Sequence, residues 1–275
     1  MTTLQGRTVL MSGGSRGIGL AIALRAAADG ANIAILAKTA EPHPRLEGTV
    51  YTAAEAIDAA GGHALPIVGD VRDDDSVAAA VEQVGRRFGG IDIVVNNASA
   101  IDLSPTATLS MKKYDLMQDI NARGSFLLAK TSLPYLQASG AAHVLTLSPP
   151  INLAPKWVGG YLGYTIAKYG MSLVTLGLAE ELRPMGIGVN SLWPRTTIAT
   201  AAVRNILGGE ELIARSRSPQ VMADAAYEIL TRDPRTCTGN FFIDDTLLRE
   251  SGVTDFSAYG DPGSLELDLY VDEWG

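Results

Sequence analysis

The feature that most constrains the fold is a regular alternation of short apolar runs with longer, alanine-rich stretches along the 275-residue chain. A buried strand of a parallel sheet reads as a near-continuous apolar run. The pattern therefore predicts an α/β fold, a doubly wound parallel sheet with helices on both faces. The expected strands are 8–12, 32–37, 64–68, 91–96, 143–147, 187–192 and 240–244. The expected helices are 17–28, 52–60, 73–88, 111–136 and 161–183, with a smaller helical region at 199–232.

We expect a single domain over residues 1–275, because no repeat, linker or low-complexity segment interrupts the alternation. The net charge of −8 comes from the end of the chain, where residues 244–275 hold nine acidic residues and one basic residue. The rest of the chain is balanced in charge, so no basic surface predicts a nucleic-acid partner. We interpret the acidic tail, from about residue 245, as a solvated terminal segment or as one packed at a subunit contact.

No apolar run reaches the roughly 18 residues that span a bilayer, and the N-terminus lacks the pattern of a signal peptide. The single cysteine, Cys237, excludes an internal disulfide and fits a reducing cytosol, where we expect it to be inert. The three histidines, His43, His63 and His143, show no metal-ligand spacing. These features predict a cytoplasmic protein with no metal and no membrane partner.

A glycine-rich stretch, SGGSRGIG at residues 12–19, joins the first expected strand to the first expected helix. Gly13, Gly17 and Gly19 occur where the backbone must turn tightly, and the helix that follows directs its N–H groups and its dipole toward a ligand there. A pyrophosphate fits such a site, although the spacing is GxxxGxG and an ordinary strand–helix turn is the simpler alternative. The strand–turn–helix context at the start of the chain favours nucleotide binding.

The end of the second expected strand bears on the choice between NAD and NADP. An acidic residue there typically binds the ribose 2′-hydroxyl of NAD, whereas a cation accommodates the 2′-phosphate of NADP. This strand ends at Lys38, the next acidic residue is Glu41, and Arg16 lies within the glycine-rich turn. Either cation alone could be an ordinary surface charge. Together they favour NADP(H), with NAD(H) as the less favoured cofactor.

Four motifs follow in order along the chain: the glycine-rich turn, NNAS at 96–99, NARG at 121–124 and YTIAK at 164–168. From residue 5 to about 245, this ordered set resembles the classical short-chain dehydrogenase/reductase family. The stretches AKTAEPHPRLEGT, LSPPINL, YTIAKYGMS and WPRTTIATAA are similar to its branch of hydroxysteroid dehydrogenase-like and citronellol/citronellal dehydrogenase-type proteins. The resemblance implies a Rossmann-type fold, hydride transfer, and assembly as a homodimer or homotetramer.

The resemblance also implies a set of cofactor-binding positions. Those expected along the phosphates are Gly13, Ser15, Arg16, Gly17, Ile18 and Gly19. Those expected at the adenine are Asp70 and Val71, those at the ribose are Asn97, Ala98 and Ser99, and those at the nicotinamide are Pro194, Thr197 and Ile198. Three positions depart from the family pattern: Ser99 and Arg195 replace glycines, and Thr200 stands one place later than the usual threonine.

Tyr164 and Lys168 lie one helical turn apart, so both side chains can face one site. Interconversion of a carbonyl and an alcohol needs a proton donor or acceptor near neutral pH, and free tyrosine, with a pKa of about 10, is poorly matched. The Lys168 ammonium is expected to lower the pKa of Tyr164 and to bind the cofactor ribose. Asn121 resembles the family asparagine that bends its helix and holds a water for proton relay; local bonding within the helix is the alternative.

The substrate-binding serine of the family has no unambiguous counterpart. Ser148 lies 16 residues before Tyr164, farther than the family serine, and laying the strand HVLTL on the usual strand puts Pro149 in the serine's place. Proline has no side-chain donor and no N–H. Two interpretations stay open: Ser148 binds the substrate oxygen, or the amide of Asn152 does so. We favour Ser148, because a hydroxyl is the right donor for a developing oxyanion.

Taken together, the residues predict an NADP(H)-dependent oxidoreductase that transfers a hydride between the nicotinamide and an apolar alcohol or carbonyl substrate. The predicted catalytic residues are Tyr164, Lys168, Ser148 and Asn121, of which the first two also contact the cofactor. The candidates for an apolar substrate pocket are Trp157, Tyr161, Trp193 and Ile198. A non-catalytic NADP(H)-binding sensor or scaffold is the main alternative, and a reductase of enoyl or imine bonds is the second.

Overall fold

The computed structural model describes residues 3–42, 47–260 and 263–272. Seven parallel strands form one sheet in the order β3-β2-β1-β4-β5-β6-β7. The strands are β1 (Thr8–Ser12), β2 (Asn32–Ala37), β3 (His63–Val68), β4 (Ile93–Asn96), β5 (His143–Thr146), β6 (Gly188–Trp193) and β7 (Phe241–Ile243). The chain order reverses between β1 and β4, so the carboxyl ends of these strands border a crevice where α/β folds bind ligands.

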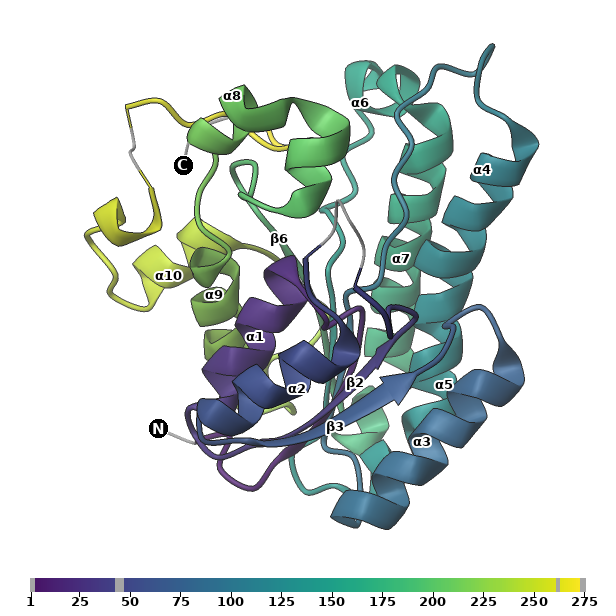
Figure 1. Ribbon diagram of the computed structural model, residues 1–275, viewed down its shortest axis with the longest axis vertical. Coiled ribbons are helices and arrows are strands. Elements are labelled where there is room, and N and C mark those ends of the chain that lie inside the picture. The colour runs from purple at the N-terminus through teal and green to yellow at the C-terminus, as the bar shows by residue number, and fades with distance from the viewer. Residues whose placement is uncertain (1–2, 43–46, 261–262, 273–275) are drawn as a thin grey trace.

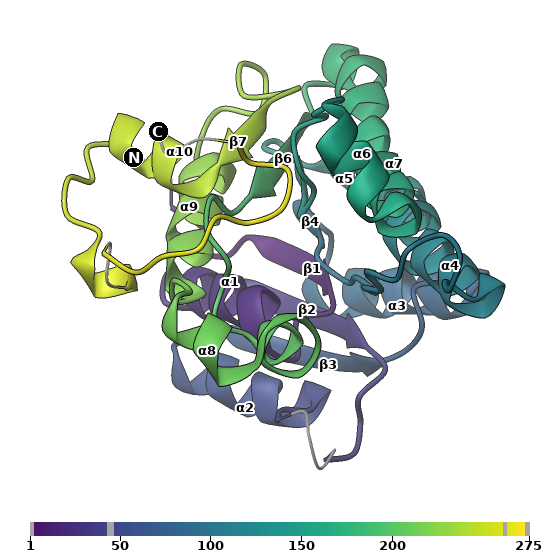
Figure 2. The ribbon, with the colours of Figure 1, turned by 90° about the horizontal axis from the view of Figure 1, so that it is seen from above.

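Helices cover both faces of the sheet, as Figures 1 and 2 show. The longer helices are α1 (Gly17–Ala27), α2 (Val50–Ala59), α3 (Asp74–Phe88), α5 (Gly124–Ala138), α7 (Leu162–Glu181) and α9 (Gln220–Leu230). The shorter ones are α4 (Met111–Met117), α6 (Pro155–Gly160), α8 (Gly209–Ala214) and α10 (Asp244–Glu250). Single turns are π-helical at η1 (Gln118–Arg123) and η3 (Val203–Leu207), and 3₁₀ at η2 (Arg183–Met185) and η4 (Ser257–Tyr259). The predicted fold class is confirmed.

Alternate residues of the central strands face opposite sides of the sheet, which gives the core two layers. Val9 and Met11 of β1 pack in the layer that contains α1, α2 and α9, whereas Leu10 packs in the layer that contains α3, α5 and α7. All three side chains are buried. Because both faces of the sheet are covered, consecutive residues in the middle of β1, β2 and β4 are apolar, which is the pattern seen in the sequence.

The strand bounds agree with the expected ones to within two residues, and the larger differences lie in the helices. The expected helix at 111–136 is divided into α4, η1 and α5, with Asn121 in the π-helical turn. Two short helices, α6 and α10, were not expected. Within the described ranges, no helix has the length and apolar character needed to cross a membrane.

The interpretation of the acidic C-terminal segment as solvated is wrong. Leu267 forms an antiparallel bridge with Thr196, and Asp268 N donates to Arg195 O at 2.9 Å. Tyr270 is only 3% exposed and packs among three aromatic rings. Figure 2 shows this segment, in yellow, returning toward β6 and β7. Apolar and polar residues alternate from 265 to 269, which suits an extended segment packed on a surface, and Tyr270 and Val271 after them are both buried.

Candidate active site

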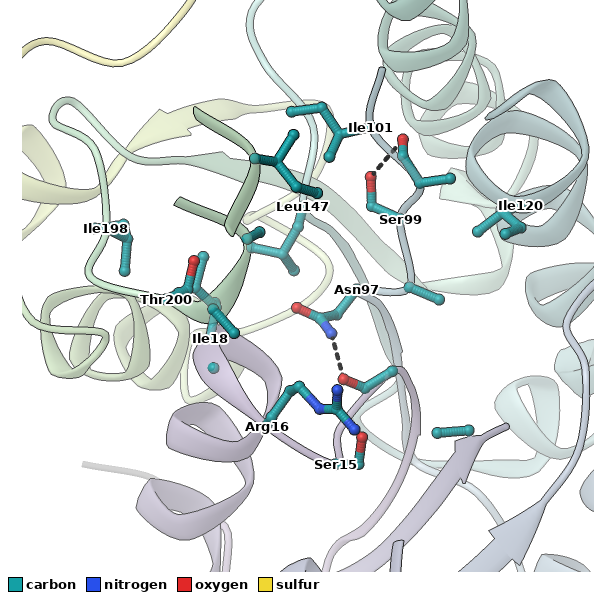
Figure 3. A pocket seen from close by; sticks show the side chains of 18 of the residues that line it. Ser15, Arg16, Ile18, Asn97, Ser99, Ile101, Ile120, Leu147, Ile198 and Thr200 are labelled. Atoms are coloured by element: carbon teal, nitrogen blue, oxygen red, sulfur yellow. Dashed lines mark hydrogen bonds between the residues drawn. The ribbon is translucent and has the colours of Figure 1, made fainter. Parts of the chain in front are cut away.

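A cavity of about 660 Å³ opens at the carboxyl ends of the central strands, and most of the predicted cofactor-binding residues line it. They are Gly13, Ser15, Arg16, Gly17, Ile18, Lys38, Asp70, Val71, Asn97, Ala98, Ser99, Tyr164, Lys168, Pro194 and Ile198. Figure 3 shows part of this lining, with Arg16 at the start of α1 and Asn97 and Leu147 after the strands β4 and β5. The folded chain thus brings residues from both halves of the sequence to one cavity.

The glycine-rich turn is shaped for close approach of a ligand. Gly13 and Gly17 have φ angles of +73° and +56°, a region that favours glycine. A Cβ on Gly13 would lie 2.9 Å from Ala98 Cα. Asn97 Nδ2 donates to Gly13 O at 2.9 Å and so ties the turn to the end of β4 (Figure 3). No side chain caps the first N–H groups of α1, which leaves them for an anion such as a pyrophosphate.

Cations gather at the end of β2. Arg16 Nη2 donates to Gly48 O at 2.7 Å, and Arg16 Nε is buried without a hydrogen-bond partner among the described residues. Lys38 Nζ lies 3.1 Å from Asp70 Oδ2, and Arg72 Nη2 lies 2.6 Å from the same oxygen. Hydrogen bonds from Arg72 above all, and from Lys38, hold the pKa of Asp70 well below its usual range. Asp70 is therefore a fixed anion between two cations.

Lys168 occupies the opposite end of the cavity, on the second turn of α7, and is 2% exposed. Its Nζ donates to Leu147 O at 2.6 Å and lies 4.9 Å from the centroid of the Trp193 ring. Burial lowers the pKa of Lys168 to about 7, and the charge of Asp268 acts in the opposite direction. Lys168 is thus held in place by the backbone after β5, next to an apolar wall.

Tyr164 lies one turn before Lys168 and is 6% exposed. Burial is the largest cause that raises the pKa of Tyr164 well above its ordinary value, and the charges of Tyr270 and Asp268 add to it. A hydrogen bond with the Ser99 side chain lowers this pKa. The sequence led us to expect that Lys168 lowers the pKa of Tyr164; in this structure burial raises that pKa instead.

Asn121 is fully buried in η1 and clamps the loop that follows β4. Its Oδ1 accepts from Ala100 N at 2.8 Å, and its Nδ2 donates to Ala100 O at 3.0 Å. Ser125 Oγ donates to Asn121 O at 2.6 Å. The helix changes its hydrogen-bond pattern at Asn121, where the sequence predicted a bend, and Asn121 reaches the cavity through Ala100. Its role in a proton relay stays a prediction.

Neither sequence candidate for the substrate-oxygen donor belongs to the described lining of the cavity. Ser148 is fully buried, and its Oγ lies 3.0 Å from Ser191 Oγ. Asn152 Nδ2 donates to Asp272 Oδ2 at 2.6 Å, toward the C-terminal segment. Neighbouring side chains of an extended chain point to opposite sides, so Leu147 lines the cavity and Ser148 does not. The structure does not bring Ser148 together with Tyr164 and Lys168.

Two further residues predicted to contact the cofactor lie behind the lining. Gly19 packs on Asn97, because a Cβ on Gly19 would lie 2.6 Å from Asn97 Nδ2. Thr197 Oγ1 lies 2.8 Å from Ser216 Oγ, and Thr197 N donates to Glu266 O at 3.0 Å. Thr200, the displaced threonine of this loop, lines the cavity instead. Gly19 and Thr197 therefore support neighbouring parts of the site.

Among the parts of the lining that were not predicted from the sequence are Asp268 with Leu269, Ile101 with Ile120, and residues 201–203 and 205–207. The alternation at 265–269 was an available signal that the C-terminal segment is ordered. The other two parts carry no such signal, because an apolar residue has the same appearance in a sequence whether it faces a core or a cavity.

The residues at the site fit a nicotinamide dinucleotide. The uncapped N-terminus of α1 and the glycine-rich turn suit its pyrophosphate, and the cations at the end of β2 suit a phosphorylated ribose. The buried tyrosine and lysine lie at the far end of the same cavity, where the reactive ring would be needed. The described residues leave a cavity of about 660 Å³ for such a ligand.

The family model described as enoyl-(acyl carrier protein) reductase matches residues 13–229. Hydroxysteroid dehydrogenase-like protein 2 of Xenopus laevis is 54% identical over 272 residues; the match covers 98% of this chain and 64% of that protein. The chain thus spans less than two thirds of the length of this relative.

Solved structures extend the comparison. A short-chain dehydrogenase from Mycobacterium thermoresistibile is 57% identical with a TM-score of 0.93, covering 98% of this chain and 96% of that one. A metagenomic short-chain oxidoreductase in complex with NADP is 25% identical with a TM-score of 0.71, covering 87% of this chain and 97% of that one. The resemblance inferred from the sequence is confirmed, and the chain belongs to the short-chain dehydrogenase/reductase family of oxidoreductases.

Proposed function

We propose that this chain is an NADP(H)-dependent enzyme that interconverts an apolar alcohol and its carbonyl compound. One observation carries the proposal: a single cavity has a glycine-rich turn and cations at one end and buried Tyr164 and Lys168 at the other. The first end suits a dinucleotide, and the second suits proton transfer at a carbonyl oxygen. A binding module without chemistry has no need of a buried lysine, whose charged form burial disfavours.

Reduction of a carbonyl group needs a hydride at the carbon atom and a proton at the oxygen atom. A bound nicotinamide supplies the hydride in reduction and accepts it in oxidation. Tyr164 Oη donates the proton to the substrate oxygen and takes it back in the reverse direction. Lys168 stabilises the phenolate that Tyr164 becomes, and its bond to Leu147 O keeps its ammonium group in place.

The choice of NADP is supported by the charges at the end of β2. Arg16 and Lys38 both line the cavity, and Arg16 Nε offers a buried donor without a hydrogen-bond partner among the described residues. The carboxylate of Asp70 is already neutralised by Lys38 and Arg72, so it does not repel a 2′-phosphate strongly. The structural relative that was solved with NADP supports the same choice.

The choice of an apolar substrate is supported by the walls around Tyr164. Leu147, Trp193 and Leu269 all line the cavity. A second cavity of about 520 Å³ adjoins the first, and Ile101 and Ile206 line both. Together the two spaces suit a molecule longer than a simple alcohol, because apolar side chains surround it while few polar groups fix its orientation.

Assembly as a homodimer or homotetramer is supported by an apolar outer face on α5 and α7. Phe126, Leu173 and Leu176 are 47%, 59% and 48% exposed. Large apolar side chains gathered on a surface mark protein contacts, and closed symmetric oligomers are the usual outcome.

A spectrophotometric screen tests the proposed function. The protein is mixed with NADPH and a panel of terpenoid, steroid and acyl aldehydes and ketones, or with NADP⁺ and the corresponding alcohols. We expect the nicotinamide absorbance to change at a rate that depends on substrate, faster with NADP(H) than with NAD(H). Tight NADPH binding without turnover of any compound would favour the sensor or scaffold, and turnover confined to enoyl or imine compounds would favour the second alternative.

A further inference from the structure

The proposed reaction needs a second hydrogen-bond donor at the substrate oxygen besides Tyr164, because negative charge develops on that oxygen during hydride transfer. Ser148 and Asn152 direct their polar atoms to Ser191 and Asp272. Pro149 has no side-chain donor, and its carbonyl already accepts a bond from Ser172 Oγ at 2.7 Å. The donor must therefore come from another wall of the cavity.

Three polar side chains of the described lining are candidates: Lys168 itself, and Ser99 and Asp268, which both act on the pKa of Tyr164. The ammonium of Lys168 donates to Leu147 O. Asp268 accepts a bond from its neighbour's N–H at 2.6 Å, and an ionised carboxylate there would repel a developing oxyanion. Of the three, only Ser99 offers a neutral hydroxyl, which can donate one hydrogen bond and still accept others.

Ser99 combines a loosely held hydroxyl with a rigid loop. Its Oγ lies 3.5 Å from Ala100 O, the long limit for a hydrogen bond, so the hydroxyl can turn to a ligand (Figure 3). The backbone on both sides is fixed: Asn121 binds the N and O of Ala100 at 2.8 and 3.0 Å, and Ala98 N donates to Ser12 Oγ at 3.1 Å. Ser99 therefore faces the cavity from a preorganised position, which is what oxyanion stabilisation requires.

We propose that Ser99 is a catalytic residue whose hydroxyl, together with that of Tyr164, binds the substrate oxygen. The inference rests on the proposed function. Two departures from the family pattern are then related. Pro149 takes the place of the family serine and removes its hydroxyl, and Ser99 replaces a glycine and supplies a hydroxyl to the same cavity. Ser99 and Tyr164 line the same cavity, and the Ser99 side chain acts on the pKa of Tyr164.

Turnover of three serine variants tests the inference once a substrate is in hand. Ser99→Ala should lower kcat by about 10²-fold or more, the usual effect of removing one such donor. Ser99→Thr keeps a hydroxyl and should restore most of kcat. Ser251→Ala, at the exposed end of α10, is the matched control. A loss below tenfold in Ser99→Ala, or a larger loss in Ser148→Ala than in Ser99→Ala, would overturn the inference.

A second measurement does not depend on turnover, so it separates failure of this inference from failure of the proposed function. Tyrosine labelled with ¹³C at Cζ gives one NMR resonance per tyrosine, and Tyr164→Phe identifies the resonance of Tyr164. We expect Ser99→Ala to shift that resonance and Ser251→Ala to leave it in place. If the Tyr164 resonance is the same with and without the Ser99 hydroxyl, the inference is wrong, even for a protein that reduces carbonyls.

Discussion

The two ends of the cavity are built in different ways. At the cofactor end, the glycine-rich turn, Lys38 and Asp70 each follow one of the first three strands of the chain. At the substrate end, Ser99, Trp193 and the C-terminal segment come from places far apart in the sequence. The cofactor end therefore consists of local motifs on a regular frame, whereas the substrate end exists only after distant segments have packed together.

The departures from the family pattern gather at the substrate end. Besides Ser99 and Pro149, Arg195 replaces a glycine in the loop after β6. Arg195 Nε lies 2.6 Å from Asp245 Oδ1, and Arg195 O accepts from Asp268 N at 2.9 Å. The Arg195 side chain thus joins the loop to α10, and its backbone oxygen joins the loop to the C-terminal segment. One end of the cavity keeps a common role in the family, and the other end can change with the substrate.

Removal of the Tyr270 ring should disturb the substrate end most. Tyr270 packs against Trp157, Tyr169 and Trp193 with ring centroids 5.8, 5.2 and 6.0 Å away. We expect Tyr270→Ala to lower the free energy of unfolding by about 4 kcal/mol and to raise KM for the substrate, as for other buried aromatics. Denaturant unfolding measures the first effect. Tyr51→Ala, at a half-exposed position on α2, is the control and should lower the free energy of unfolding much less. Equal losses of stability in the two variants would contradict the role given to Tyr270 at the substrate end.

Tyr164→Phe should impair the substrate end of the cavity and leave the cofactor end unchanged. It removes the proton donor but leaves the glycine-rich turn and the cations intact, so kcat should fall by about 10²-fold or more. NADPH affinity, measured by nicotinamide fluorescence, should stay within about twofold because the ring remains. A variant that keeps most of its activity would show that Tyr164 is not the proton donor.

Lys38→Asp should act on the cofactor end alone. We expect wild-type protein to bind NADPH at least about tenfold more tightly than NADH, or about 1.4 kcal/mol, and the variant to lose or reverse this preference. Turnover at saturating cofactor should change little, because Lys38 lies at the opposite end from Tyr164. Equal affinities of the unaltered protein for the two cofactors would contradict the assignment of Arg16 and Lys38.

Asp268→Asn should give the smallest effect, and one that depends on pH. Burial raises the pKa of Asp268 to about 7, whereas an unfolded aspartate titrates near about 4. The folded state therefore binds more protons between these values, and the contribution of Asp268 to stability is lost as pH rises from 4 to 7. The variant should gain more in thermal unfolding temperature at pH 8 than at pH 4.5. A gain that is the same at both pH values would mean that Asp268 does not titrate as stated.

The sequence predicted the regular part of the molecule and missed contacts between distant segments. Buried parallel strands show their apolar runs directly, so β1 and β2 were predicted with their bounds. The side on which Ser148 lies could not be predicted, since a shift of one residue along an extended chain reverses it. The resemblance predicted a bend at Asn121, but not the two hydrogen bonds between Asn121 and Ala100, which are 21 residues apart. The partner of Asp268, Arg195, is likewise distant in the chain.

The central claim is that one cavity holds a nicotinamide at one end and protonates a substrate oxygen at the other. Transfer of deuterium from NADPH labelled at its transferring position, followed by mass spectrometry of the product alcohol, tests this claim most directly. We predict one deuterium on the carbinol carbon of the product from wild-type protein and a rate about 10²-fold lower with Tyr164→Phe. Consumption of NADPH without label in the product, or equal transfer by both proteins, would contradict the account.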